Sequence, residues 1–197
     1  MQISQKKNIA IFASGTGTNA ANIIQYFSEK QTAVIGLIVC NNPQAGVLKI
    51  AATNNIPTLI IEKEKFFRGD AYVPELKNVG IDFIVLAGFL WKIPSPVINA
   101  YRDNIINIHP ALLPKYGGKG MYGNFVHAAV LSAKEKESGI TIHFVDEFYD
   151  NGKTLFQITC PVYENDTTET LAKRIHELEY KYFPKVIEEL VSDKVLK

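Results

Sequence analysis

Short, unbroken apolar runs alternate with amphipathic stretches through the first half of the sequence. The apolar runs contain almost no polar positions, which is typical of strands buried on both faces of a parallel sheet. The stretches between them repeat apolar residues at helical spacing. We therefore predict strands at residues 9–14, 33–40, 57–61, 82–88 and 105–109, and helices at 19–27, 45–55 and 68–80. This order favours an α/β fold: an open, mostly parallel, Rossmann-like sheet with helices on both faces.

The pattern changes in the second half. After an expected helix over 124–136, residues 139–163 begin with alternating apolar and polar positions and contain the turn signal Asp150-Asn151-Gly152. This combination predicts an antiparallel C-terminal hairpin. A long amphipathic helix is expected over 167–191, with Asp166, Thr167 and Thr168 as capping candidates. Its apolar face is predicted to carry Leu171, Ile175, Leu178, Tyr182, Val186 and Leu190.

Composition narrows the class of protein. The 197 residues are 47% hydrophobic and 21% charged, which fits one globular domain without a linker. The net charge of +1 does not favour binding to nucleic acid or to an anionic membrane. No apolar run approaches the ~20 residues that span a bilayer, and the N-terminus makes a poor signal peptide. We expect a cytoplasmic protein in which Cys40 and Cys160 are buried free thiols.

A glycine-rich loop joins the first strand to the first helix. In Ser14–Ala20, "SGTGTNA", Gly15 and Gly17 permit tight backbone conformations that expose N–H groups. Together with the positive end of the following helix, these groups favour an anion, typically a phosphate. The spacing also fits the loose dinucleotide fingerprint, but the second strand ends in "VCNNP", without the acidic residue of such sites. A phosphate site, a dinucleotide site and a plain turn all stay open.

The segment Asn104–Gly118, "NIINIHPALLPKYGG", carries a candidate reaction centre. Asn107 and His109 lie two residues apart in an expected strand, so both side chains point to one face. An imidazolium and a carboxamide there can both donate to an oxygen that becomes an oxyanion during acyl transfer. The alternative is a structural histidine with an amide that caps the loop. A carboxylate partner for His109 is expected from the acidic loop, where Asp146, Glu147 and Asp150 all stay open.

Other kinds of catalytic site find little support. The remaining histidines, His127, His143 and His176, show no metal-binding spacing, so no metal is expected. No serine lies in a nucleophile-elbow pattern, and neither cysteine lies in an activating context, which disfavours covalent catalysis.

Four motifs together resemble one family. They are "FASGTGTN", "FIVLAGFL", "NIINIHPALLPKYGG" and "GITIHFVDEFYDNG", and the resemblance extends over about residues 8–190. In this order and spacing they resemble the phosphoribosylglycinamide formyltransferases, folate-dependent enzymes of purine biosynthesis. The resemblance implies transfer of a formyl group from 10-formyltetrahydrofolate to the amine of 5-phosphoribosylglycinamide. It also implies a single domain over 1–197, with a phosphate-binding half at about 8–100 and a folate-binding, catalytic half at about 101–190.

The resemblance also assigns roles to matching positions. It implies catalysis by Asn107, His109 and Asp150, substrate binding by Gly17, Thr18, Asn19, His176 and Glu179, and folate binding by Arg68, Leu90, Trp91, Lys92, Ile93, Asn107, Asp146, Glu147, Phe148, Tyr149 and Asp150. It implies no metal. The expected partners are these small molecules, without nucleic acid or membrane, in a monomer or a homodimer.

Two segments depart from the family pattern. "KGMYGNFVH" follows "LLPKYGG" where many relatives carry "PGLHTH", and "FLWKIP" replaces the common arginine-bearing version. Methionyl-tRNA formyltransferases and formyltetrahydrofolate hydrolases resemble the same core with a further domain, so we expect both to match this length less well. A hydrolase-like enzyme and a non-catalytic nucleotide-binding module stay as alternative functions.

The expected chemistry is electrostatic. Protonated His109 and the Asn107 amide are predicted to donate to the oxyanion, while Asp150 orients His109 and favours its protonated form. The glycine loop is predicted to anchor the phosphate away from the reacting atoms.

Overall fold

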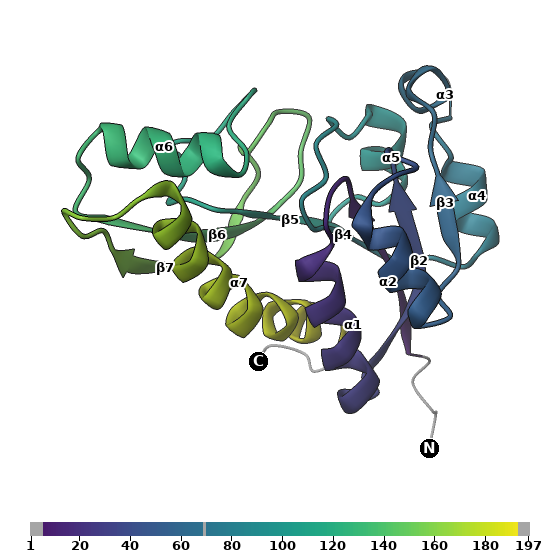
Figure 1. The fold of residues 1–197 in the computed structure, drawn as a ribbon. Coiled ribbons are helices and arrows are strands. Elements are labelled where there is room, and N and C mark those ends of the chain that lie inside the picture. Colours follow the sequence, from purple (N-terminus) through teal and green to yellow (C-terminus); the bar gives the residue numbers. More distant parts are fainter. Residues whose placement is uncertain (1–5, 69, 193–197) are drawn as a thin grey trace.

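The computed structural model of the protein describes residues 6–68 and 70–192. Within these ranges, one sheet has the strand order β3-β2-β1-β4-β5-β6-β7 (Figure 1). The strands are β1 (Lys7–Ala13), β2 (Ala33–Cys40), β3 (Thr58–Ile60), β4 (Phe83–Leu86), β5 (Ile105–His109), β6 (Glu137–Phe144) and β7 (Thr154–Pro161). The first five strands pair in parallel, whereas β6 and β7 pair antiparallel to their neighbours. The predicted sheet is confirmed.

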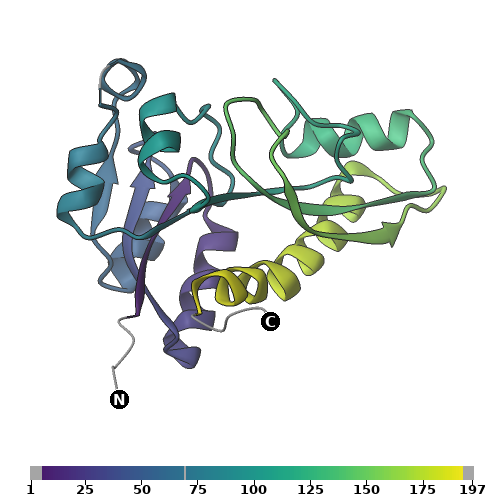
Figure 2. The ribbon, with the colours of Figure 1, turned by 180° about the vertical axis from the view of Figure 1, so that it is seen from behind.

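Helices cover both faces of this sheet, as predicted (Figures 1 and 2). They are α1 (Thr18–Lys30), α2 (Gly46–Thr53), α3 (Lys63–Phe67), α4 (Val73–Asn78), α5 (Ser95–Ala100), α6 (Asn124–Ser132) and α7 (Thr168–Val191). One apolar core joins the sheet to α1, α2, α6 and α7, and a second joins it to α3, α4 and α5. No helix among the described residues has both the length and the apolar character needed to cross a membrane.

The central strand β1 explains the unbroken apolar runs. Ile9 and Ile11 face the core shared with α1 and α7, while Ala10 and Phe12 face the core of α3, α4 and α5. All four side chains are almost completely buried. Both sides of the strand therefore have to be apolar, which is why the sequence does not alternate there.

The strand order places a crevice at the carboxyl ends of β1 and β4. From β1 the chain first builds outward through β2 and β3, then returns to the other side of β1 for β4 and β5. The loops after β1 and β4 therefore run in opposite directions, and open α/β sheets bind ligands at such a switch point. Two hydrogen bonds join these loops: Ser14 N–H to the Gly88 carbonyl at 3.1 Å, and Leu90 N–H to the Ser14 hydroxyl at 2.9 Å.

Helix boundaries before β4 and after it differ from the prediction. The helix predicted over 68–80 is wrong in its first turn, because α4 begins only at Val73. Ala71 and Tyr72 have positive φ angles of 50° and 66°, which cannot continue a helix, and Pro74 belongs to the first turn of α4. The short helices α3 and α5 were not predicted.

The C-terminal elements differ in detail. The Thr167 hydroxyl accepts from the Thr170 N–H, so Thr167 is the cap among the three candidates. The buried face of α7 partly differs from the predicted one, since Glu179, Phe183 and Ile187 are buried. The strands β6 and β7 are connected by residues 145–153, a longer connection than the predicted tight turn.

Candidate active site

A cavity of about 590 Å³ opens at the switch point. Its walls come from the glycine loop, the segment after β4, the end of β5, the loop 118–123, the loop 145–150 and α7. The predicted site residues that line it are Gly17, Thr18, Asn19, Leu90, Trp91, Lys92, Ile93, Asn107, His109, Asp146, Phe148, Tyr149, Asp150, His176 and Glu179. Segments predicted to bind phosphate, folate and the reacting groups thus share one cavity.

Arg68 and Glu147 are predicted folate-binding residues that the structure does not bring to the cavity wall. The Arg68 guanidinium lies 2.6 Å from the Glu64 carboxylate, and the Arg68 side chain is 79% exposed. The Glu147 side chain is also exposed. The predicted folate-binding residues that do line the cavity are therefore those after β4 and the other members of the acidic loop.

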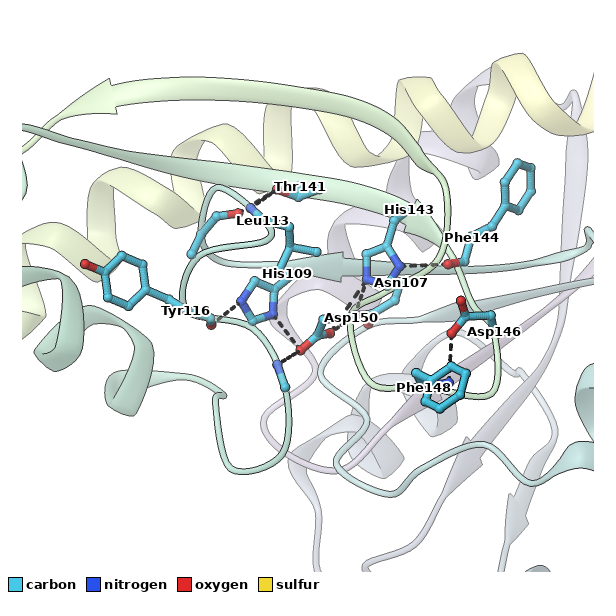
Figure 3. A network of polar contacts seen from close by, with 12 residues as sticks. Asn107, His109, Leu113, Tyr116, Thr141, His143, Phe144, Asp146, Phe148 and Asp150 are labelled. Atoms are coloured by element: carbon cyan, nitrogen blue, oxygen red, sulfur yellow. Dashed lines mark hydrogen bonds and ion pairs between the residues drawn. The ribbon is translucent and has the colours of Figure 1, made fainter.

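Asn107, His109 and Asp150 meet at the end of β5 (Figure 3). One Asp150 oxygen, Oδ2, lies 3.6 Å from His109 Nδ1 and accepts the Gly118 N–H at 2.8 Å. The other, Oδ1, lies 3.5 Å from Asn107 Nδ2. The structure thus selects Asp150 among the three candidate carboxylates. Asp146 accepts from Phe148 and Asn151 within its own loop instead.

Burial controls the charge of His109, which is 3% exposed. Burial lowers the pKa of His109, and the Asp150 carboxylate and the Tyr116 carbonyl oppose this effect without reversing it. The ring is therefore mainly neutral at pH 7, contrary to the expectation of a protonated His109. The Tyr116 carbonyl lies 2.8 Å from Nε2 and can only accept, so the neutral ring carries its proton on Nε2.

Asp150 is held as a carboxylate by its surroundings. Burial raises the pKa of Asp150, but the neighbouring rings of His143 and His109 and the Gly118 N–H together outweigh burial and lower it. The site therefore has a fixed negative charge beside the neutral ring of His109.

His143 belongs to this network and was not among the predicted site residues. In the β5–β6 pairing it lies opposite Asn107, on the same face of the sheet. Its Nδ1 lies 2.7 Å from the Phe144 carbonyl, so Nδ1 donates and Nε2 accepts from Asn107 Nδ2 at 3.2 Å. The antiparallel hairpin was predicted, but its register, which would have identified His143, was not.

The glycine loop forms the other end of the cavity. Gly17 caps α1 with a φ of +81°, and a Cβ there would lie 2.7 Å from the Val47 Cβ. Only glycine fits this conformation and this approach without strain. The first N–H groups of α1 thus face the cavity region where an anion was predicted.

Asn19 and Glu179 connect the glycine loop to α7. Asn19 Nδ2 donates to Glu179 at 2.8 Å, across 160 positions of sequence. Glu179 is 5% exposed, and burial raises its pKa, although Asn19 and His176 oppose this effect. His176 lies one helical turn earlier, on the exposed side of α7 and on the cavity wall.

Comparison with known proteins identifies the family. The profile of the family described as formyl transferase matches residues 7–187. The phosphoribosylglycinamide formyltransferase of Bacillus subtilis (strain 168) is 37% identical over 191 residues, 94% of this chain and 95% of the relative. The chloroplastic protein of the same name from Arabidopsis thaliana is 40% identical over 197 residues, 97% of this chain and 68% of the relative. A crystal structure of phosphoribosylglycinamide formyltransferase from Bacillus Halodurans aligns with a TM-score of 0.87 and 35% identity, covering 95% of this chain and 96% of that chain.

The chain belongs to the formyl transferase family. The resemblance predicted from the sequence and the α/β class are thereby confirmed. The relatives favour the formyltransferase interpretation over the hydrolase and the nucleotide-binding module.

Both segments that depart from the formyl transferase pattern reach the cavity. Trp91 lines the cavity, with its ring centroid 5.8 Å from that of Phe66 and 5.6 Å from that of Phe67. The loop 118–123 also lines the cavity and leads into α6. Both segments therefore contribute to the walls of the cavity that holds Asn107, His109 and Asp150.

Proposed function

We propose that this chain transfers a formyl group from 10-formyltetrahydrofolate to the amine of 5-phosphoribosylglycinamide, a step of de novo purine biosynthesis, through a tetrahedral intermediate. The observation that carries the proposal is a single cavity lined by Asn107, His109 and Asp150 and also by the glycine loop. Membership of the formyl transferase family supports the reaction class.

The glycine loop is the proposed phosphate site. Gly17, Thr18 and Asn19 lie where backbone N–H groups and the α1 terminus favour an anion. His176 and Glu179 are the proposed partners of the ribose and glycinamide part. Anchoring the phosphate at one end positions the amine near β5 and lowers the entropic part of the barrier.

The segment after β4 and the acidic loop form the proposed folate site. Leu90, Trp91 and Ile93 present apolar surface to the cavity, with Lys92 beside them, and Phe148 and Tyr149 line it from the acidic loop. Backbone groups of residues 146–150 can bind the polar edge of a pterin, while apolar side chains pack on its ring. An apolar wall with polar groups at its rim fits a flat heterocyclic co-substrate.

The proposed chemistry uses only hydrogen-bond donors and a proton-carrying group that side chains of this protein provide. The glycinamide amine attacks the formyl carbon, and negative charge builds on the formyl oxygen. The N–H groups of Asn107 and His109 leave their acceptors in the protein and donate to this oxygen instead. Neutral His109 takes the proton that leaves the amine, directly or through water, and Asp150 stabilises the resulting imidazolium. The same proton then reaches N10 of the folate as the C–N10 bond breaks.

The proposal includes the setting of the reaction. We propose a single domain whose phosphate-binding half, about 8–100, and catalytic half, about 101–190, work on one cavity. We also propose a cytoplasmic monomer or homodimer that acts on these small molecules, without a metal, a nucleic acid or a membrane. The net charge of +1 supports small-molecule partners, because it offers no bulk attraction to polyanions.

His109→Asn is the variant that tests the proposal. Formyl transfer is expected to fall by about 10²–10³ or more, because the ring that donates to the oxyanion and carries the proton is lost. Asp150→Asn is expected to lose turnover with near-normal substrate binding. Transfer from 10-formyltetrahydrofolate to 5-phosphoribosylglycinamide is measured, with loss of the formyl group to water as the control. A His109→Asn enzyme with unchanged transfer would show that the mechanism is wrong.

A further inference from the structure

His127 is a buried histidine that the proposed mechanism does not use. It lies on α6, is 2% exposed and lines the cavity. Its Nδ1 is buried and has no hydrogen-bond partner within residues 6–68 and 70–192. A buried polar nitrogen without a partner costs free energy, so native proteins normally satisfy such atoms with protein, water or ligand. An unsatisfied atom on the wall of a binding cavity points to a ligand.

The position of His127 indicates which part of a ligand it would meet. The rings of His109 and His176 both lie close enough to influence its charge. His109 belongs to the reaction centre, whereas His176 lies on α7, one turn from Glu179. His127 therefore faces the stretch of cavity between the reacting group and the α7 residues.

The charge state of His127 limits the chemistry of its partner. Burial, helped by His176 and His109, lowers the pKa of His127 to about 4, so the ring is neutral at physiological pH. A neutral imidazole offers one N–H donor and one acceptor lone pair. A phosphate is better matched by a cation, whereas a hydroxyl can donate to or accept from Nδ1 in either tautomer.

We propose that His127 Nδ1 hydrogen-bonds a ribose hydroxyl of the formyl acceptor, which makes His127 a further substrate-binding residue. The inference rests on the proposed function, because it takes 5-phosphoribosylglycinamide as the acceptor. In that molecule the ribose lies between the phosphate and the reacting amine. His127 shares the cavity with His109 at the reaction centre and with His176 and Glu179, the proposed partners of the ribose part.

The test combines variants of residue 127 with acceptors that lack one hydroxyl. The acceptors are 5-phosphoribosylglycinamide and its 2-deoxy and 3-deoxy analogues. Wild-type kcat/KM is expected to fall about tenfold for the analogue that lacks the bonded hydroxyl. His127→Leu is expected to use the complete acceptor about tenfold less well and to lose this discrimination, so both acceptors give similar kcat/KM. The KM for 10-formyltetrahydrofolate is expected to stay within about twofold, because the folate wall is elsewhere.

A conservative pair keeps the test decisive if His127→Leu does not fold. The Asn amide lies near the position of Nδ1 and the Gln amide near that of Nε2, so His127→Asn is expected to keep most of the discrimination and His127→Gln to lose it. Ser132→Ala, an exposed change at the end of α6, is the matched control and is expected to behave as wild type. Thermal unfolding verifies that each variant is folded.

The outcomes separate the two proposals. Equal discrimination in wild type, His127→Asn and His127→Gln would mean that Nδ1 bonds water only, and it would overturn this inference alone. Discrimination that follows Nδ1 supports it. A wild-type enzyme that formylates none of the three acceptors would overturn the proposed function as well.

Discussion

At the residue scale, burial decides the charge of two histidines. His109 and His127 are both almost fully buried, and burial is the largest influence on the pKa of each ring. Asp150 opposes this effect at His109, whereas the neighbours of His127 are histidines that reinforce it. These surroundings support the proposed roles of His109 as a proton carrier beside a carboxylate and of His127 as a neutral hydrogen-bonding group.

Acid is expected to destabilise the protein through His127. The folded pKa is about 4, against about 6.5 in the unfolded chain, so the unfolded state binds more protons between these values. Stability from the neutral ring is complete above the unfolded pKa and is lost as the pH falls through the folded pKa. The loss is about 3 kcal/mol at most. Urea unfolding of wild type and His127→Leu at about pH 7.5 and pH 4.5 measures it, and equal acid losses in both proteins would contradict it.

The sequence predicted which residues form the site better than it predicted the hydrogen-bond and charge partners of these residues. The two-residue period of a strand placed Asn107 and His109 on one face, and the structure agrees. The sequence did not single out Asp150 as the partner of His109, because this depends on the path of the loop 145–153. That path follows from tertiary contacts such as the hydrogen bond from the Gly118 N–H to Asp150. His143 required the register of β6 on β5. The charge of His109 could not be predicted, because it depends on how deeply the ring is buried, and no local sequence pattern shows this.

At the element scale, the glycine loop depends on one backbone conformation. Gly17→Ala is expected to destabilise the protein by about 2 kcal/mol and to weaken binding of the phosphorylated acceptor, because φ is +81° and the new Cβ would meet Val47 at 2.7 Å. Gly15→Ala is the matched control for stability, since nothing lies within 4 Å of its Cβ. Thermal unfolding and the KM for the acceptor measure both effects. Equal stability of the two variants would contradict the prediction.

The loop after β5 is anchored to the residues that follow α6. Glu135 Oε1 accepts from Lys115 Nζ and from the Tyr116 hydroxyl, each at 2.9 Å. Tyr116, with a positive φ of 57°, presents its carbonyl to His109 Nε2. This anchor therefore holds the acceptor that fixes the proton of His109.

Glu135→Ala is expected to lower kcat about tenfold while the KM of each substrate changes little, because a displaced loop misplaces His109. Tyr116→Phe is expected to lower kcat less than Glu135→Ala does, since Lys115 still binds Glu135 in this variant. Steady-state kinetics with both substrates varied measures the split. A raised KM at constant kcat would assign the anchor to substrate binding instead.

The helices that sequence reasoning misjudged are short and rich in turn residues. The α4 helix starts late because Ala71 and Tyr72 take left-handed conformations that no hydrophobic pattern signals. The α5 helix is flanked by Pro94 and carries Pro96 in its first turn, so its single turn resembles a loop in sequence. Longer elements such as α1 and β2 were predicted correctly, because their patterns repeat over several turns or residue pairs.

At the scale of the whole molecule, the cavity joins segments that are distant in sequence. The glycine loop follows β1, Asn107 and His109 lie at the end of β5, Asp150 follows β6, and α7 contributes His176 and Glu179 to the same cavity. The pairing of β4 with β5 makes both halves parts of one sheet. The distance between anchor and reaction centre is therefore set by the sheet.

An acceptor without its phosphate is expected to show a lower kcat as well as a higher KM. In the proposed mechanism, binding energy at the glycine loop holds the amine at the reaction centre, so loss of the phosphate affects the reacting geometry. Kinetics with ribosylglycinamide and its 5-phosphate measures this, with the KM for 10-formyltetrahydrofolate as the control. A change in KM alone would mean that the loop contributes uniform binding only.

The hydrogen bonds around β5 carry a consequence for selectivity against water. Both Asn107 N–H groups are directed at His143 and Asp150, and the single proton of neutral His109 is directed at Tyr116. When the folate co-substrate binds without the amine, Asn107 and His109 have no free N–H group to activate its formyl carbonyl. We therefore expect slow loss of the formyl group to water until the amine enters and these hydrogen bonds are redistributed.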